Sequence, residues 1–415
     1  MKLSRYGKHY SGQSGIVTLM DDLDSALRDN PDMLMMGGGS PARIPEVEIL
    51  FQQALQQLAN DAQLSQSLLG RYQGPKGDLA VRELLAQQLA EDYGWPLTAD
   101  HIALTNGGQS AFAIIANMLA GNSDAGHRTL HFPLVPEYIG YADACIEPDS
   151  LSASQPAIQL LPNGLFKYSL DPALKIPANA AALCVSRPTN PSGNVLSDAE
   201  LQWLDAAARK RDIPLIIDAA YGLPFPALHY TNDTHPYWSD NVILLLSLSK
   251  VGLPGVRGGF VIAAPEFIEA FSRANTILNL AVGNLGPMLA NILLRNRQLQ
   301  TLSREVLQPW YKTRADTALR LIQAELHGVP CHIHQPQGAF FLWLWFPGLP
   351  VSTAVLYEEL KQAGLLIIPG DGSFFGLCEA WQHSRECIRL SYAVSDTCLQ
   401  MGSAILGQVM RRIFG

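Results

Sequence analysis

A lysine near the middle of the chain closes an apolar run, where a charged side chain is costly to bury. Lys250 ends the stretch "LLLSLSK", and a glycine-rich bend leads from it to Arg257, seven residues later. Burying an ammonium group costs several kcal/mol unless its charge is paired or lost. The position therefore predicts either an anchor for an anion or a nucleophilic amine.

Three other polar segments also follow apolar runs. They are "LTNGGQSAF", "SRPTNPSGN" and "IIDAAYGLPFP". Taken singly, each residue has an ordinary explanation: Asn190 suits a turn, Asp218 suits a helix cap, and a surface lysine extends its amine to solvent. Together the segments place an amide, a carboxylate and an amine at strand ends, the edge where parallel sheets bind ligands.

The residues around these segments alternate between short apolar runs and helical patterns. Apolar residues recur every three or four positions over 47–69 and 78–93, and helices are expected to begin at Gln109 and Asp198. The apolar runs between them are expected strands: "HIALT", "TLHFP", "AALCVS", "IPLIID", "VILLLSLS" and "GGFVIAA". This order predicts an α/β fold whose large domain holds a mostly parallel sheet covered by helices.

The C-terminal part has a different order of elements. Helical patterning runs over 265–326, followed by the apolar stretches "GAFFLWLWF", "LLIIPG" and "CIRLSYA" and a last helix. With 415 residues, 48% of them hydrophobic, the chain exceeds the usual size of a single core. We predict a large domain at 49–300, a smaller α+β domain at 301–415, and an N-terminal segment, 1–48, that contributes to the small domain. No long linker separates them, so they should pack closely.

Composition and motifs disfavour several classes of partner. The formal net charge is −8 without a run of Lys and Arg, which disfavours nucleic acid and anionic membrane surfaces. No apolar segment reaches the roughly 18 residues of a membrane span, so a cytoplasmic protein is expected. The six cysteines form no C-x-x-C pair, and no metal site is predicted. The chain also lacks a P-loop and a G-x-G-x-x-G motif after a strand.

The four strand-end segments together resemble the pyridoxal 5'-phosphate-dependent aminotransferases of fold type I, class I/II, and the resemblance covers nearly the whole chain. It implies that Lys250 forms the Schiff base with the cofactor and that Asp218 contacts the pyridinium nitrogen. Asn190 and Tyr221 then contact the ring oxygen. A lysine in a partly desolvated pocket beside other cations loses its proton easily and serves as nucleophile and base. Lys250, Asp218 and Tyr221 are the expected catalytic residues.

The resemblance also implies a cup for the cofactor phosphate. Its expected members are a guanidinium, a hydroxyl and two amides at the start of a helix, from Arg257, Ser247, Gly108 and Gln109. The spacing from Lys250 to Arg257 is one residue shorter than in the commonest form of the family, which leaves the path of this loop open.

Two tyrosines complete the expected cofactor site. Tyr138 in "FPLVPEYIGY" matches the aromatic residue that stacks on the pyridine ring, with an ordinary core tyrosine as the alternative. Tyr72 in "RYQGPKG" matches a tyrosine that reaches the phosphate of the neighbouring subunit. The resemblance therefore implies a homodimer with shared active sites.

The substrates implied by the resemblance are small amino acids and 2-oxo acids. Arg389 in "CIRLSYA" matches the arginine that binds the substrate carboxylate, aided by Asn190 and the backbone near Gly39, with a structural ion pair as the alternative. Longer stretches such as "FPLVPEYIGYADA" and "QGAFFLWLWFPGLP" are similar to family members that pass the amino group of valine to pyruvate in a ping-pong exchange. The segments expected to line the pocket offer no second cation, although Arg43 and Arg71 stand near two of them.

Two other classes of function stay open. Related enzymes of this fold use the same lysine, aspartate and tyrosine for β-elimination or cyclopropane synthesis, because the reaction depends on which substrate bond stands perpendicular to the ring. An aminotransferase-like effector-binding domain of a transcription regulator is the other class. The net charge of −8 and the short segment before "GGGSP" disfavour a DNA-binding head.

Overall fold

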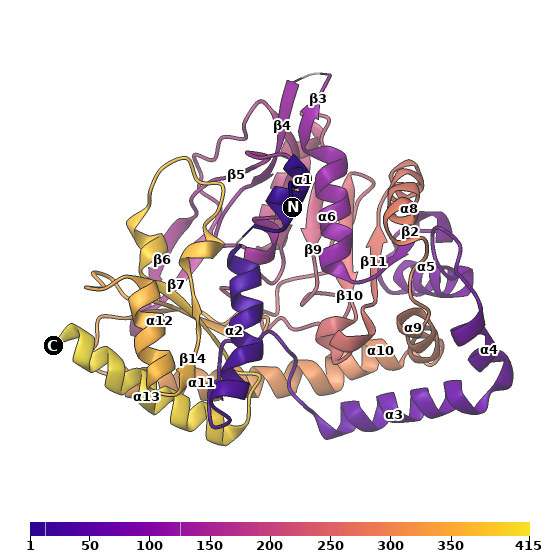
Figure 1. Cartoon of the computed structure of the whole chain (residues 1–415). Helices are drawn as coiled ribbons and strands as arrows, with labels where there is room; N and C mark the ends of the chain where they lie inside the picture. The colour runs from indigo at the N-terminus through magenta and orange to yellow at the C-terminus, as the bar shows by residue number, and fades with distance from the viewer. Residues whose placement is uncertain (13, 125) are drawn as a thin grey trace.

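The computed structural model describes residues 1–12, 14–124 and 126–415, and its largest element is a sheet of eight strands (Figure 1). The strand order is β2-β11-β10-β9-β8-β4-β3, and β5 pairs with β4 beside this path. The bounds are β2 Ile102–Thr105, β3 Gly121–Ser123, β4 Gly126–Phe132, β5 Leu151–Ala153, β8 Ala180–Ser186, β9 Leu215–Asp218, β10 Val242–Ser247 and β11 Gly259–Ile262.

The central strands run parallel, as the alternation of strands and helices predicts. The strands β4, β8, β9 and β10 form successive parallel pairs, whereas β11 is antiparallel to both β10 and β2. Every residue of β2, β8, β10 and β11 is buried, which explains why these strands are continuous apolar runs. The prediction of an α/β fold with a mostly parallel sheet is confirmed.

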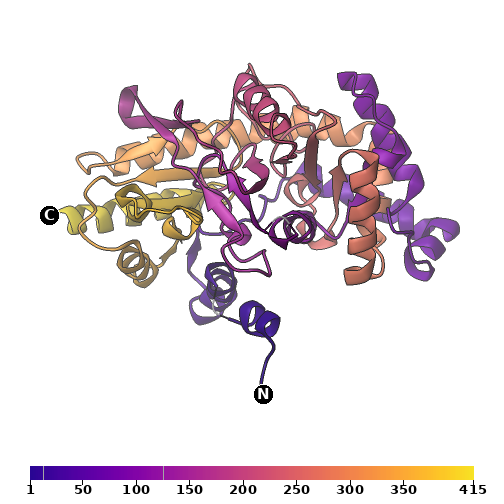
Figure 2. The same ribbon diagram turned by 90° about the horizontal axis from the view of Figure 1, so that it is seen from above.

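Helices cover both faces of this sheet. Helix α6, Gly108–Leu119, packs on one face, and α7, Asp198–Arg209, packs against β8 and β9 from the other (Figures 1 and 2). Ser197 and Glu200 form a capping box at the start of α7, which explains why the helix begins where the sequence predicts. Helix α5, Leu79–Tyr93, begins after Asp78, whose side chain accepts a hydrogen bond from the amide of Val81.

Two long helical patterns are divided in the structure. The pattern over 47–69 forms α3, Pro45–Asn60, and α4, Ala62–Gly70, because the carboxylate of Asp61 accepts hydrogen bonds from the amides of the next helix and starts it anew. The pattern over 265–326 breaks where Leu280 and Arg297 adopt positive φ angles. It forms α8 Pro265–Asn279, α9 Leu285–Arg295, α10 Gln298–Thr301, a π-helical turn Leu302–Leu307 and α11 Gln308–Glu325.

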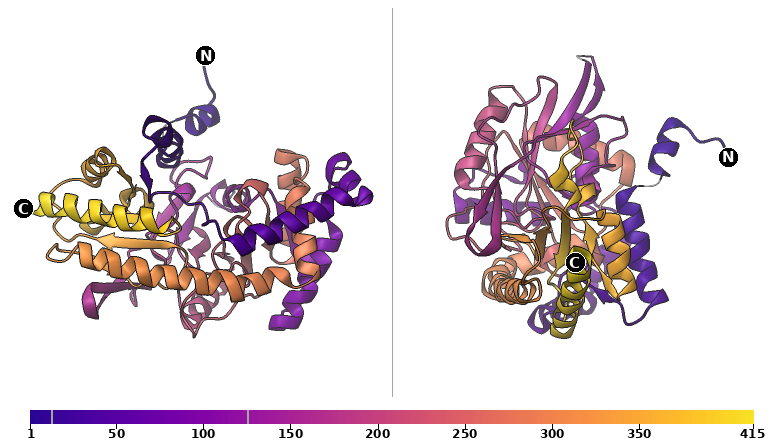
Figure 3. Two further views of the ribbon diagram at one scale, coloured as in Figure 1. Left: turned by 90° about the horizontal axis from the view of Figure 1, so that it is seen from below. Right: turned by 90° about the vertical axis from the view of Figure 1, so that its left-hand side faces the viewer.

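A second sheet of six strands lies beside the first. Its order is β15-β16-β13-β12-β7-β6. The bounds are β6 Ala157–Leu161, β7 Leu165–Ser169, β12 His332–His334, β13 Phe341–Trp345, β15 Ile368–Pro369 and β16 Cys387–Ser391. Helix α11 runs alongside α13, Asp396–Phe414, near this sheet, and α12, Thr353–Gln362, packs near β15 (Figure 3). The hairpin β6–β7 is an addition that the sequence reading missed.

The N-terminal segment connects the two regions. It holds α1 Arg5–Tyr10, α2 Gly15–Asp29 and the short strand β1 Leu34–Met35, which pairs with β14 Leu365–Leu366. The Tyr10 hydroxyl donates to the carbonyl of Ala144 at 2.7 Å, whereas Asp22 accepts from Tyr357 on α12. Figure 3 shows both helices standing at the edge of the molecule.

The division of the chain at 49–300 and 301–415 remains our proposal, with the hairpin β6–β7 as an excursion from the first range into the second sheet. Short 3₁₀ turns lie at Ala99–His101, Ile139–Tyr141, Pro162–Gly164, Ser249–Val251, Pro254–Val256, Asp371–Ser373 and Gln382–Arg385. No helix within the three described ranges is both long and apolar enough to cross a membrane.

Candidate active site

The carboxyl ends of β8, β9 and β10 meet at one edge of the large sheet. Ser186, the last residue of β8, lies in register with Asp218, the last residue of β9, and Asp218 lies in register with Leu245 of β10. The polar segments that follow these strands are therefore neighbours in space, as predicted.

Lys250 lies in the 3₁₀ turn Ser249–Val251, just past β10. Its Nζ donates a hydrogen bond to the carbonyl of Gly39 at 2.7 Å, and it stands 5.3 Å from the ring centre of Tyr221 and 5.7 Å from that of Phe340. Burial lowers the pKa of Lys250 to about 8, and the cation of Arg389 acts in the same direction. An amine with this pKa is partly neutral near pH 8, which is what a nucleophile or a base requires.

Asp218 presents its carboxylate at the end of β9. One oxygen accepts a 2.8 Å hydrogen bond from the amide of Ala220, and the other accepts a short hydrogen bond from the Tyr141 hydroxyl. Burial raises the pKa of Asp218, and no ion pair of this carboxylate occurs in the described parts of the chain. A buried carboxylate without a cation favours a positively charged ligand, such as a protonated pyridine nitrogen.

Arg389 enters the same site from β16 of the second sheet. Its two terminal nitrogens donate to Asn190 Oδ1 at 2.7 Å and to the carbonyl of Gly37 at 2.6 Å, and its guanidinium lies 4.2 Å from the ring centre of Phe341. The Nε atom is buried without a partner, and burial lowers the pKa of Arg389 to about 10. No carboxylate pairs with it among the described residues, so the guanidinium is available to an anionic ligand.

A second arginine lies at the start of α6. A Cβ added to Gly107, whose φ is 94°, would lie only 2.7 Å from a terminal nitrogen of Arg257, so the guanidinium rests against the backbone there. The amides of Gly108 and Gln109 begin α6 beside it. A helix N-terminus and an exposed guanidinium together attract a phosphate group. Arg257 itself adopts a φ of 51°, in the left-handed region.

Ser247 and the predicted aromatic residues lie around these groups. Ser247 is buried at the end of β10, where its Oγ accepts from the amide of Ser249. Tyr221 is buried between the lysine and Phe340, and burial raises its pKa well above the ordinary value. Burial also raises the pKa of Tyr138, and the nearby cations of Arg389 and Arg257 act against that rise. Tyr138 therefore lies within electrostatic reach of both arginines.

These groups fit pyridoxal phosphate by their chemistry. Asp218 has no ion-pair partner among the described residues, Arg257 stands with a helix N-terminus suited to a phosphate, and Lys250 holds an amine of lowered pKa. The role of each residue toward this cofactor is our proposal.

Tyr72 lies apart from this group. It follows α4, 84% of its surface is exposed, and no hydrogen bond or ring contact of Tyr72 occurs in the part of the chain that the structure describes. Within one subunit it contributes nothing to the site, so its predicted role depends on a second subunit.

Sequence reasoning missed three residues of the site: Glu137, Tyr141 and Ser186. The ring of Tyr141 stacks on Phe112 with a centroid distance of 3.9 Å, and its hydroxyl holds Asp218. Glu137 is buried and accepts two hydrogen bonds from Ser186. The repeated tyrosines in "EYIGY" were the available signal, but the choice between them required the fold.

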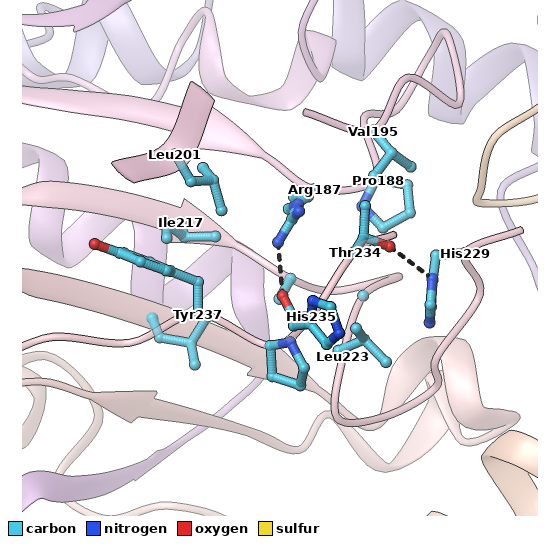
Figure 4. A pocket seen from close by; sticks show the side chains of 14 residues that line it. Arg187, Pro188, Val195, Leu201, Ile217, Leu223, His229, Thr234, His235 and Tyr237 are labelled. Carbon is cyan, nitrogen blue, oxygen red and sulfur yellow. Dashed lines mark hydrogen bonds between the residues drawn. The ribbon is translucent and has the colours of Figure 1, made fainter. Parts of the chain in front are cut away.

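A small cavity lies beside β9, and Figure 4 shows the side chains that line it. Its volume is about 20 Å³, and Ile217, whose side chain points away from that of Asp218, is among the lining residues. Arg187 lines it but donates to Leu196, His235 and Asp198. All three guanidinium nitrogens of Arg187 already donate within the chain, so this arginine offers no free donor to a substrate. We regard the cavity as part of the supporting structure.

Comparison with known proteins agrees with this geometry. The sequence model of the aminotransferase class I and II family matches residues 46–402. The chain is 42% identical over 414 residues to a valine–pyruvate aminotransferase from Escherichia coli K12, covering 99% of each chain.

Two solved structures extend the comparison. An amino-acid aminotransferase from Psychrobacter arcticum 273-4 matches with a TM-score of 0.95 and 40% identity, covering 100% of this chain and 99% of the other. The valine–pyruvate aminotransferase of Salmonella typhimurium LT2 matches with a TM-score of 0.88 and 41% identity, covering 96% of this chain and 99% of the other. The similarity thus extends over the whole fold.

Proposed function

The chain belongs to the aminotransferase class I and II family, and we propose that it transfers the amino group of valine, or of a similar neutral aliphatic amino acid, to pyruvate, which becomes alanine. Similarity to two valine–pyruvate aminotransferases supports this choice of substrates. The structural observation that carries it is Arg389, a buried guanidinium with a free Nε at the same site as Lys250.

The residues of the chain divide the chemistry between them. Pyridoxal phosphate, on which this family depends, supplies a ring that takes up the electron pair released when a bond at the substrate α-carbon breaks. Lys250 Nζ, in its neutral form, acts as a nucleophile and moves a proton from and to that carbon. Asp218 would favour a protonated ring nitrogen, and Asn190 and Tyr221 would contact the ring oxygen.

We attribute the choice of donor to the lack, among the described residues, of a cation at the site beyond Lys250, Arg257 and Arg389. Arg43, which stands near "GGGSP" in the sequence, pairs with Glu48 and its side chain is 88% exposed, so it turns away from the site. Arg71 is also exposed within its own subunit, beside Tyr72. An acidic side chain would lose its hydration without gaining a partner, whereas the methyl groups of valine gain about 1.5 to 3 kcal/mol from burial.

A donor screen of the cofactor-loaded protein tests this function. With pyruvate as acceptor and alanine as the measured product, we expect kcat/KM for valine to exceed the values for aspartate and glutamate by at least about a hundredfold, which about 2.7 kcal/mol provides. Comparable values for valine and aspartate would overturn the choice of donor. Conversion of the cofactor to its amine form by valine, without acceptor, separates transamination from β-elimination.

A homodimer with shared active sites is part of the proposal. Five large exposed side chains form what we call the apolar face: Leu69, Tyr72, Ile277, Leu278 and Leu280. The two segments that carry them are neighbours, because the Asn284 side chain donates to the carbonyls of Ser67, Leu68 and Arg71.

The apolar face also adjoins the phosphate site. The amide of Gly283 donates to Asn106 Oδ1 at 3.0 Å, directly before Gly107. A second copy seated on this face would bring its own Tyr72 toward that phosphate site, which supports the predicted role of this residue.

We also propose a cytoplasmic location. All six cysteines are free thiols, three of them buried, which suits a reducing compartment.

A further inference from the structure

A second buried carboxyl group stands behind the site, and the proposed chemistry does not use it. Glu137 directly precedes Tyr138 and is only 1% exposed. Ser186 donates to it twice, from its amide to Oε1 at 2.8 Å and from its Oγ to Oε2 at 2.6 Å. Burial raises the pKa of Glu137 to about 8, and the negative charge of Asp218 adds to the rise.

A chain of polar contacts connects this carboxyl group to Asp218. Ser186 Oγ lies 3.4 Å from the Tyr141 hydroxyl, and that hydroxyl donates to Asp218 Oδ2. Ser186 and Asp218 are also register partners on adjacent strands, so their separation is fixed by the sheet. The order of contacts is Glu137, Ser186, Tyr141, Asp218.

The direction of each hydrogen bond follows from the number of protons. Ser186 has one hydroxyl proton. When Glu137 is ionised, Ser186 gives it that proton and presents only lone pairs to Tyr141; when Glu137 holds a proton of its own, it can donate to Ser186 Oγ, and the serine proton is then free for Tyr141. Tyr141 has one proton and gives it to Asp218. Glu137 thus decides what Ser186 offers to Tyr141, and Tyr141 in turn sets how strongly the carboxylate form of Asp218 is stabilised.

The groups facing Glu137 include no cation in the parts of the chain that the structure describes. Its titratable neighbours are Asp218, Tyr141 and Cys184, all buried, and its remaining partner is the amide of Tyr138. A carboxyl group here costs free energy that a neutral side chain of equal shape would not.

We propose that Glu137 is a positioning residue that acts through Ser186 and Tyr141 to set the proton affinity of Asp218 where it meets the ring nitrogen of the cofactor. This inference rests on the proposed function. In this inference Glu137, which does not contact the substrate, helps to set the extent to which the ring nitrogen of the cofactor is protonated.

The variant Glu137→Gln tests this inference. Its Oε1 still accepts from the Ser186 amide, but its Nε2 donates to Ser186 Oγ, which turns the serine proton toward Tyr141. Wild-type Glu137 leaves the serine proton free for Tyr141 only while it holds a proton of its own, so the variant differs from wild type where wild-type Glu137 is ionised. There Tyr141 would stabilise the carboxylate of Asp218 more strongly, the ring nitrogen would hold its proton less tightly, and the imine formed with Lys250 would become more basic. We expect the pH midpoint of the cofactor absorbance, recorded without substrate, to rise by at least about 0.5 unit, with kcat/KM for valine lowered about tenfold.

Two comparisons separate positioning from general damage. In a Ser186→Ala background, Glu137→Gln should move the midpoint by less than about 0.2 unit, because the intermediary is gone. Asp205→Asn removes another buried carboxylate, which bonds Asn241 at the opposite edge of the sheet, and should leave the midpoint unchanged. If Glu137→Gln does not fold, Glu137→Asp, which is too short to reach both Ser186 atoms, is measured in the same way and should also raise the midpoint.

An unchanged midpoint in the folded variant, or equal shifts with and without the Ser186 hydroxyl, would overturn the inference. The same samples test the proposed function separately. If the wild-type protein does not convert its cofactor with valine, the function fails; if it does and the midpoint of the variant is unchanged, only the role of Glu137 fails.

Discussion

The strand-edge site and the apolar face differ in what each one lacks. At the strand edge nearly every polar group has a partner within the chain. Two groups have no ion-pair partner among the described residues: the carboxylate of Asp218 and the guanidinium of Arg389. On the apolar face, Tyr72 and Ile277 are each 84% exposed, so these large side chains are not packed against the rest of the chain. The first region can be completed by small charged molecules, whereas the second requires a protein surface.

The largest effect should come from removing the amine at the strand edge. We expect Lys250→Ala to fold and bind the cofactor but to lose at least about 10⁴-fold in kcat, because nucleophilic attack and proton transfer depend on the same Nζ. The rate of the valine half-reaction is the measurement. Lys312→Ala, which removes an exposed lysine paired with Asp316, is the control and should keep normal activity. Near-normal turnover of Lys250→Ala would exclude the assignment.

A substitution of Arg389 also tests the site at the strand edge. Arg389→Lys should lower kcat/KM for valine about 10²- to 10³-fold, mostly through KM, because one ammonium group cannot serve Asn190, Gly37 and a substrate carboxylate together. Initial rates over a range of valine concentrations measure it. A KM within about twofold of the wild-type value would make Arg389 a structural residue.

The apolar face is tested by mixing two inactive proteins. Lys250→Ala and Tyr72→Ala should each be nearly silent, but a hybrid dimer contains one site with an intact lysine and an intact tyrosine from the other subunit. Random exchange should restore about a quarter of the wild-type activity. Hybrids verified by differential tagging that stay inactive would show that Tyr72 does not act in the partner's site.

The smallest effect concerns the cost of buried charge in the cofactor-free protein. Because the folded-state pKa of Glu137 is raised to about 8, its contribution to stability is present below its ordinary pKa and is lost as the pH rises toward 8. Glutamine does not titrate, so the variant Glu137→Gln does not lose stability in this way. The free energy of unfolding of the variant minus that of wild type should therefore rise by at least about 1 kcal/mol from pH 5 to pH 8, measured by urea unfolding. Parallel pH curves for the two proteins would contradict a buried, proton-binding Glu137.

The sequence predicted the parts of the site that depend on one short segment each. Lys250 and Asp218 follow or end apolar runs whose strand character was plain, so their convergence followed from parallel topology. Arg389 lies on an antiparallel strand of the second sheet, and its place in the site was expected from the family resemblance alone. Glu137 and Tyr141 could not be found in this way. A glutamate normally lies at the surface, and its burial here results from contact with a strand end almost fifty residues away in the chain.

The missed elements of the fold have a similar cause. Strands β6 and β7 are short and partly exposed, so their patterns are weak, and their place in the second sheet depends on β12, which pairs with β7 far along the chain. The break between α3 and α4 depends on one carboxylate, Asp61, which a periodicity argument does not register.

The hairpin β6–β7 also constrains how the chain is made. Its residues leave the ribosome well before β12, the strand on which β7 is completed, because residues 170–331 must be synthesised in between. At about 5–20 residues per second this interval is on the order of ten seconds or more. During that time the edge of β7 that will pair with β12 is open, and β1 stays without its partner β14 for longer still. The second sheet can close only near the end of translation, so the nascent chain is most exposed to aggregation while its first sheet is already assembling.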